Sequence, residues 1–398
     1  MANVRRRVSA EERRVRAAAR LLRGGGEHGG GAGGAEEVVR QLVALHATDP
    51  ATVYLSVAAR LKDPAQAVPL LDMALYGQPA TLTRMLAMRR TMFVVERSFA
   101  PQVYAAAGRA VAARLRKELL VFLRDGGGWD EAWLDEVEAE VVAALDGRPE
   151  SSGAELSKLV PRLREQVVVA RGKPYEATQN VASRIIRTMA AEGRIERRRP
   201  AGSWVSGQFR WANAEPLPEV PGAAARAELV RAWLAAYGPG TEADVKWWTG
   251  WTLGDTRAAL KAAGAEEVEL GGGVTGYVAA GDTAEVVGGS APAPEVALLP
   301  ALDPLAMGWR ERGWFLPEGS ERLFDRSGNI GPTVWWGGEV VGGWAQRADG
   351  AVVWRLLADR GAQVAEATGA AAAVLGSAMG SARVTPRFRT PLERELSL

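Results

Sequence analysis

The chain has 398 residues, of which 47% are hydrophobic, and a formal net charge of +2, so it is long enough for two to four packed domains of ordinary size. It contains no cysteine and only two histidines, His28 and His46, which excludes disulfides, thiolate nucleophiles and cysteine zinc sites. We therefore expect no metal and no cofactor, and at most two candidates for a catalytic imidazole.

The N-terminal segment carries its charge as arginine, because residues 1–25 contain eight arginines and two glutamates. The segment has no uninterrupted apolar stretch, so it does not resemble a secretory signal, and no later stretch is apolar for long enough to cross a bilayer. We expect a cytoplasmic protein. The glycine tract at 24–34 contains His28 and lacks the lysine of a phosphate-binding loop, which is typical of a linker.

Residues 1–97 are predicted to form a first winged-helix module. A helix is expected over 35–45, and a second begins after Asp49 and Pro50, since aspartate caps a first turn and proline suits the first helical position. Residues 79–97 have the pattern of two short strands joined by a tight turn, the form of a wing. Two arginines of this wing are candidates for contacts with DNA phosphates: Arg84 and Arg89.

A mostly helical connection is expected over 98–150, followed by a second winged-helix module over 151–215. In this module an amphipathic helix over 177–193 precedes a basic two-stranded wing, the order of a helix-turn-helix with a hairpin. Helix and wing are charged together, which favours phosphate contacts over the alternative of a solvated basic face. The candidates are Arg184, Arg187, Arg197, Arg198 and Arg199.

A third winged-helix module is predicted over 223–283, and residues 284–398 are predicted to form a small β-domain with a helix near 360–376. The fold class is therefore α+β: three tandem winged-helix domains and a C-terminal β-rich, barrel-like domain. The tryptophans of these segments fall in periodic helix and strand patterns, so we assign most of them to the core and none to base stacking.

Five sequence blocks in order resemble the AlkZ/YcaQ family of DNA glycosylases. The blocks are residues 45–60, 80–95, 237–250, 298–312 and 328–344. The resemblance covers nearly the whole chain and implies a concave DNA-holding surface built by tandem winged-helix domains. It also implies monofunctional removal of alkylated purines, including bulky or crosslinked N7-alkylguanine.

The resemblance also places the catalytic residues. The signature of the family is Gln-x-Gln or Gln-x-Asp, and His46 and Thr48 occupy its positions in this chain. A neutral His46 between two helices is expected to accept a proton or hydrogen bond from the attacking water, and Thr48 is expected to hold that water. Excision should then decline below roughly pH 6.5, the unperturbed pKa of histidine, and the surroundings of His46 would move this midpoint. The alternatives are a histidine bonded to backbone and a turn hydroxyl, while Asp49 is better explained as a helix cap.

Two functions are compatible with these residues. The first is a glycosylase that removes bulky N7-alkylguanine from double-stranded DNA, giving self-resistance to a DNA-alkylating natural product. Such an enzyme is expected to be associated with the nucleoid when bound to DNA. The second is a non-catalytic winged-helix regulator or lesion sensor. A regulator is expected to dimerise on a palindromic site, whereas three modules in one chain can hold DNA as a monomer, which favours the enzyme.

Overall fold

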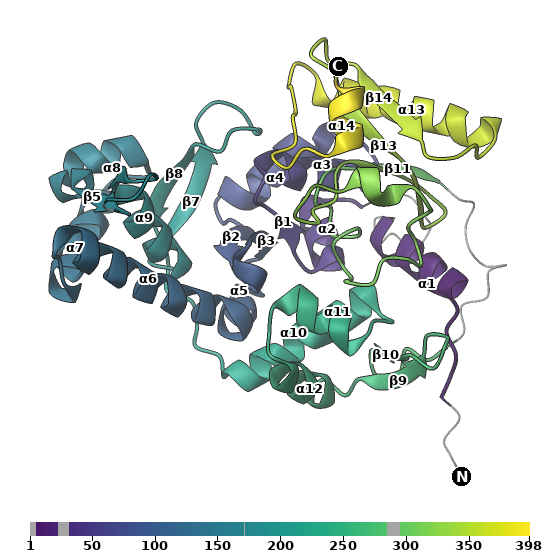
Figure 1. Ribbon diagram of the computed structural model, residues 1–398, viewed down its shortest axis with the longest axis horizontal. Helices are drawn as coiled ribbons and strands as arrows, with labels where there is room; N and C mark the ends of the chain where they lie inside the picture. The colour runs from purple at the N-terminus through teal and green to yellow at the C-terminus, as the bar shows by residue number, and fades with distance from the viewer. Residues whose placement is uncertain (1–4, 23–31, 171, 285–294) are drawn as a thin grey trace.

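The computed structural model describes residues 5–22, 32–170, 172–284 and 295–398, and Figure 1 shows their arrangement. The first module lies near the centre of the molecule, with the second to one side, the third below it and the C-terminal sheet above it (Figure 1). His28 and most of the glycine tract lie outside the described residues. In the described part, no helix is long and apolar enough to span a membrane.

The N-terminal helix and the first module contain both helices and strands. Their elements are α1 (Ala10–Ala17), α2 (Ala35–Leu42), β1 (Leu45–His46), α3 (Pro50–Ala58), α4 (Ala67–Tyr76), β2 (Leu82–Leu86) and β3 (Met92–Glu96). The sheet is antiparallel with the order β1-β3-β2, so the predicted hairpin over 79–97 is confirmed. The helix predicted over 35–45 is too long, because Val43 has a φ of 63° and ends it. His46 consequently lies on a strand paired with β3, and not on a turn between helices.

The helical connection and the second module follow, with a hydrophobic core of their own. Their elements are α5 (Ala100–Val103), α6 (Arg109–Gly127), α7 (Glu131–Leu145), β4 (Ser151–Ser152), α8 (Gly153–Leu159), β5 (Gln166–Val169), β6 (Ala177–Asn180), α9 (Ala182–Ala191), β7 (Ile195–Pro200) and β8 (Phe209–Asn213). The wing is confirmed as the hairpin of β7 and β8. The amphipathic helix starts five residues later than predicted, because residues 177–180 pair with β5.

The third module has the predicted order of helices and hairpin. Its elements are α10 (Gly222–Tyr237), α11 (Glu242–Thr249), α12 (Leu253–Ala262), β9 (Glu266–Glu269) and β10 (Thr275–Val278). Thr241 begins α11 by a reciprocal capping arrangement with Asp244, and Gly250 ends it with a φ of 78°. The sequence signals at both ends of this helix therefore determine its length.

The C-terminal domain is an antiparallel sheet with the order β11-β12-β13-β14, covered by helices. Its elements are β11 (Val296–Leu299), β12 (Thr333–Trp336), β13 (Glu339–Gln346), β14 (Val352–Leu356), α13 (Ala362–Met379) and α14 (Pro391–Leu396). The predicted barrel-like form of this domain is wrong, because the sheet is open in the described residues. Instead of closing on itself, the sheet packs against α13 at β11 and β14 and against α14 at β13.

Short helical turns complete the chain and one of them is important for the site. They are the π-helical turns Ala18–Leu22 and Tyr104–Gly108 and the 3₁₀ turns Pro64–Gln66, Met88–Arg90, Pro161–Arg164 and Ser320–Leu323. The first module, the third module and the C-terminal domain share one hydrophobic core. This shared core brings the turn between β2 and β3 against α11, and the candidate site lies at that contact.

Candidate active site

His46 is buried at the edge of the first module's sheet. Its backbone pairs with Phe93 of β3, and the imidazole lies 4.8 Å from the Phe93 ring, measured between centroids. The ladder continues beyond the strand, because the Ala47 amide donates to the Met92 carbonyl at 2.8 Å. Only 6% of His46 is exposed. The residue is therefore fixed by strand pairing and by an aromatic neighbour, which limits its ring to a small range of orientations.

The imidazole has one polar neighbour in the described part of the chain. Arg89 Nη2 lies 3.3 Å from His46 Nε2, while Nδ1 is buried and has no hydrogen-bond partner among the described residues. Burial, and then the positive charge of Arg89, lowers the pKa of His46 from its ordinary 6.5 to about 3. The side chain is accordingly neutral near pH 7, and its backbone lies on a strand, where a turn between helices was predicted.

This pKa predicts a flat pH profile for any reaction that needs neutral His46. The single-turnover rate, corrected for spontaneous base loss, should stay level from pH 8 to pH 5, with the midpoint moved from 6.5 to about 3. The charged group that acts on the imidazole is Arg89, and the charge of Arg312 acts in turn on Arg89. Measuring excision at each pH checks the prediction, and a midpoint between 6 and 7 would contradict it.

Arg89 is held in an unusual position by two neighbouring modules. Its φ of 52° lies in the left-handed region, which costs free energy for a residue with a side chain. The guanidinium lies over the ring of Trp247 on α11, 4.1 Å from the centroid. Gly250 permits this approach, since a Cβ there would lie 3.3 Å from the Arg89 backbone nitrogen. Burial, and then the charge of Arg312, lowers the Arg89 pKa to about 10, so the group stays charged at neutral pH.

Trp247 and Arg312 are members of this site that the sequence analysis did not identify. The Arg312 guanidinium lies 5.1 Å from the centroid of the same Trp247 ring that Arg89 contacts. Trp247 belongs to a periodic helical pattern, which predicts a core residue and gives no signal of a cation contact. Both residues are remote in sequence from the first module, and the docking of the modules brings them to Arg89, the neighbour of His46.

Thr48 and Asp49 follow His46 and have different roles. Asp49 Oδ1 accepts from the Ala51 amide at 3.1 Å and Oδ2 accepts from the Arg387 amide at 2.9 Å, which confirms the predicted helix cap. Both carboxylate oxygens are thus used structurally. Thr48 is half-buried and immediately precedes the cap, and its part in holding water stays a prediction.

Seven arginines were predicted to bind DNA, and two of them, Arg84 and Arg197, are enclosed in the protein, as Arg89 is. Arg84 is 7% exposed, and its Nε donates to the Tyr76 hydroxyl at 3.4 Å. Arg84 and Arg197 lie 5.1 and 5.0 Å from the centroid of the Phe209 ring, at the joint of the first and second modules. Burial, and then the charge of Arg84, lowers the pKa of Arg197 to about 10. Their enclosure leaves the phosphate contacts to other residues.

The remaining four arginines of the second module are divided between paired and unpaired groups. Arg198 forms an ion pair with Glu196 at 3.2 Å, and Arg199 forms one with Asp72 of α4. Arg184 and Arg187 are exposed on α9 and form no ion pair within the described ranges, while Arg184 donates to the Gln179 side chain at 3.0 Å and lies over the Phe122 ring. We therefore expect Arg184 and Arg187 to be the most available to phosphates.

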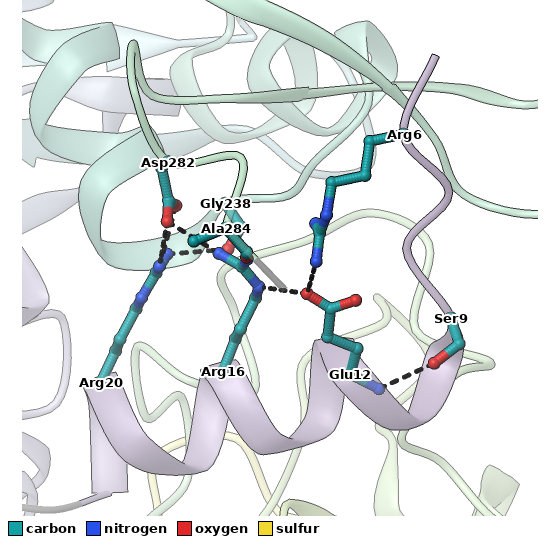
Figure 2. Close-up of polar contacts among 8 residues, drawn as sticks. All are labelled: Arg6, Ser9, Glu12, Arg16, Arg20, Gly238, Asp282 and Ala284. Atoms are coloured by element: carbon teal, nitrogen blue, oxygen red, sulfur yellow. Dashed lines mark hydrogen bonds and ion pairs between the residues drawn. The ribbon is translucent and has the colours of Figure 1, made fainter. Parts of the chain in front are cut away.

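Three of the N-terminal arginines, Arg6, Arg16 and Arg20, bond to other groups of the protein (Figure 2). Arg16 bonds to Glu12 at 2.9 Å and to Asp282 at 2.8 Å, and Arg20 bonds to the same Asp282 at 2.8 Å. Arg20 also donates to the Gly238 carbonyl at 3.0 Å. These contacts fasten α1 and the turn after it to residues 238–284, so Arg16 and Arg20 are not free to form a basic surface. No group of three or more metal-ligating side chains occurs in the described residues.

Comparison with known proteins agrees with this arrangement of modules. Residues 39–383 match the family model described as DNA glycosylase AlkZ-like. The chain belongs to the AlkZ-like DNA glycosylase family. Its fold is similar to that of the DNA glycosylase AlkZ of Streptomyces sahachiroi, with a TM-score of 0.67 and 21% identity over 96% of this chain and 99% of that one. No curated protein matches the chain.

Membership of the AlkZ-like family identifies the reaction class. The protein is a DNA glycosylase, an enzyme that cleaves the bond between a base and its deoxyribose. The match covers both His46 and Arg89 on the first module and Trp247 on the third. The site described above therefore lies within the part of the chain that defines the family.

Proposed function

We propose that the chain hydrolyses the N-glycosidic bond of bulky N7-alkylguanine adducts in double-stranded DNA. His46 is the observation that carries the proposal: it is a buried neutral imidazole with Nδ1 unpartnered in the described structure, at the first position of the glutamine signature of the resembled family. Thr48 supplies a hydroxyl at the second position. Both side chains can hold a water molecule by hydrogen bonds, as glutamine does.

The chemistry of the adduct reduces what the protein must supply. An N7-alkylated guanine is already cationic, so it leaves as a neutral base without a strong general acid. The enzyme must position a water at C1′ and tolerate the positive charge that develops on the sugar. A charged histidine would oppose that charge, and the low pKa of His46 avoids this. Neutral His46 thus suits a reaction that passes through an oxocarbenium-like state.

Release of an N7-alkylguanine base from duplex DNA tests the proposal directly. With enzyme in excess, the wild-type chain should free the base and leave an abasic site in a single turnover, without added metal or nucleotide. Chromatography of the released base and cleavage of the abasic strand measure the two products. Tight binding to the adduct with no release across a series of bulky N7 adducts would instead support the non-catalytic lesion sensor.

Contacts of α9 with phosphates make a separate prediction about DNA affinity. Replacing Arg184 and Arg187 together with alanine should reduce the slope of log affinity against log salt by about 2, because each phosphate contact contributes roughly 0.9. Titrations of undamaged duplex at several salt concentrations measure the slope. Arg322→Ala, which removes an exposed arginine paired with Glu395 in the C-terminal domain, is the matched control and should leave the slope unchanged. An unchanged slope in the double variant would remove α9 from the DNA surface.

The biological setting that fits this activity is self-resistance to a DNA-alkylating natural product, with the chain acting as a monomer on DNA. The glutamine positions are occupied here by His46 and Thr48, and an altered site suits an unusual adduct. A host strain that lacks this chain should become more sensitive to one alkylating product of its own, and equal sensitivity would contradict the proposal.

Sedimentation of the DNA complex measures its stoichiometry, and one chain per lesion is expected.

A further inference from the structure

The contact between Arg89 and His46 determines which nitrogen of the imidazole carries the proton. A guanidinium has only N–H donors and no acceptor. Its pKa of about 10 keeps Arg89 protonated at neutral pH, so Nε2 of His46, 3.3 Å from Arg89 Nη2, must present its lone pair. A neutral imidazole has one proton, which then resides on Nδ1. His46 is thereby left with a hydrogen-bond donor and no available acceptor.

The position of Arg89 is enforced by the third module. The left-handed backbone at Arg89 directs the side chain back over Trp247, and Gly250 leaves room for the turn. In the described part of the chain, no carboxylate forms an ion pair with Arg89, so nothing competes with His46 for its Nη2. A strained residue held by contacts from another module is typical of a functional position.

We propose that Arg89 is a positioning residue that fixes His46 as the Nδ1–H tautomer, so that His46 donates a hydrogen bond to the attacking water and does not act as its base. This inference rests on the proposed glycosylase function. Nδ1 is buried and has no partner among the described residues, so it is the ring nitrogen whose hydrogen bond is left for a water once the adduct is bound. The third module, through Trp247, then contributes to a site whose reacting residues lie on the first.

The hydrolysis balances without a protein base. One lone pair of the water oxygen accepts from Nδ1–H, and the other forms the new bond to C1′. The bond from C1′ to N9 breaks, and its electron pair neutralises the cationic base as it leaves. The water that has added then loses a proton to a second water molecule, since the lone pair of Nε2 is held by Arg89 and Nδ1 already carries its proton.

Such a site selects its substrates by charge. Without a base to activate the water and without an acid to assist the leaving group, only a base that is already cationic leaves readily. Purines alkylated on a ring nitrogen that makes them cationic meet this condition. Neutral lesions, such as an O6-alkylguanine or uracil, should remain in the DNA even when they are bound.

Nitrogen-15 spectroscopy of the histidines tests the tautomer directly, and the chain has only two of them. In the free protein, His46 should show a protonated Nδ1 and an unprotonated Nε2 between pH 5 and pH 8, and a His28→Gln variant assigns the other signal. Arg89→Met should move the proton to Nε2 and lower single-turnover excision at least about tenfold. Arg89→Lys, which keeps an N–H donor, should retain the Nδ1–H tautomer and much of the rate.

Arg90→Met is the matched control, because Arg90 lies in the same turn with a φ of 59° but bonds to Glu118 on the surface. It should change neither the tautomer nor the rate. An Nε2–H tautomer in the wild type, or an Arg89→Met variant with the wild-type tautomer and rate, would overturn the inference. The spectra do not depend on catalysis, so a wild type that releases no alkylated base would contradict the proposed function while leaving the tautomer to be judged separately.

Discussion

His46→Ala is expected to lower single-turnover excision of an N7-alkylguanine by roughly a hundredfold to a thousandfold, the usual effect of removing one positioned hydrogen-bond donor. The side chain is buried beside Phe93 and contacts Arg89, so it is not placed to hold DNA from the surface. The affinity for adduct-containing duplex should therefore stay within about twofold of the wild type. A loss of rate at constant affinity indicates an interaction that is made in the transition state.

His46→Gln separates a donor role from a purely structural one. The glutamine amide has N–H donors and also an oxygen that can accept from Arg89, so it can replace both interactions of the Nδ1–H tautomer. We expect this variant to recover most of the rate lost in His46→Ala. Comparable rates for wild type and His46→Ala would move catalysis to other residues, and a low rate for His46→Gln with an intact fold would show that the amide does not substitute for the imidazole.

The order of elements could be predicted because their signals are local. The Asp49 and Pro50 cap, the capping residues of α11 and the alternating patterns of the hairpins each lie within a few residues of the structure that they specify. The predicted secondary structure is wrong where pairing with a strand that is distant in sequence determines the conformation. His46 comes directly after the helix predicted over 35–45, yet it belongs to a strand because it pairs with β3. The early part of the predicted 177–193 helix likewise pairs with β5.

The candidate site was predictable only in part for the same reason. The resemblance to a known family identifies His46, but no sequence pattern gives the contact of Arg89 with Trp247, since the two residues lie on different modules. Seven arginines of the first and second modules were predicted to contact DNA phosphates. The structure instead places several of them against aromatic rings inside the protein, Arg84 and Arg197 among them. Charge in the sequence therefore does not reveal whether a guanidinium faces solvent or another module.

Asp303→Asn is expected to lower the free energy of unfolding by about 3–5 kcal/mol, the cost of leaving a buried charge without its partner. Asp303 and Arg60 are both inaccessible to solvent and joined by two hydrogen bonds of 2.8 and 2.9 Å. Thr52, Ser56 and Arg60 form a stripe along α3 and just beyond it, and all three bond to residues 301–303. The pair therefore fastens the helix that follows His46 to the C-terminal segment.

Chemical denaturation followed by tryptophan fluorescence measures the loss of unfolding free energy in Asp303→Asn, which should be seen in the first unfolding transition. Glu395→Gln is the matched control. Glu395 pairs with Arg322 at the exposed surface, where water screens the charges, so this change should leave the transition where it was. The double variant Arg60→Met with Asp303→Leu should be more stable than Asp303→Asn, because it removes both buried charges together. If the double variant is less stable than either single change, the backbone carbonyls that accept from Arg60 at Leu21 and Ser56, and not the ion pair, hold this part of the fold.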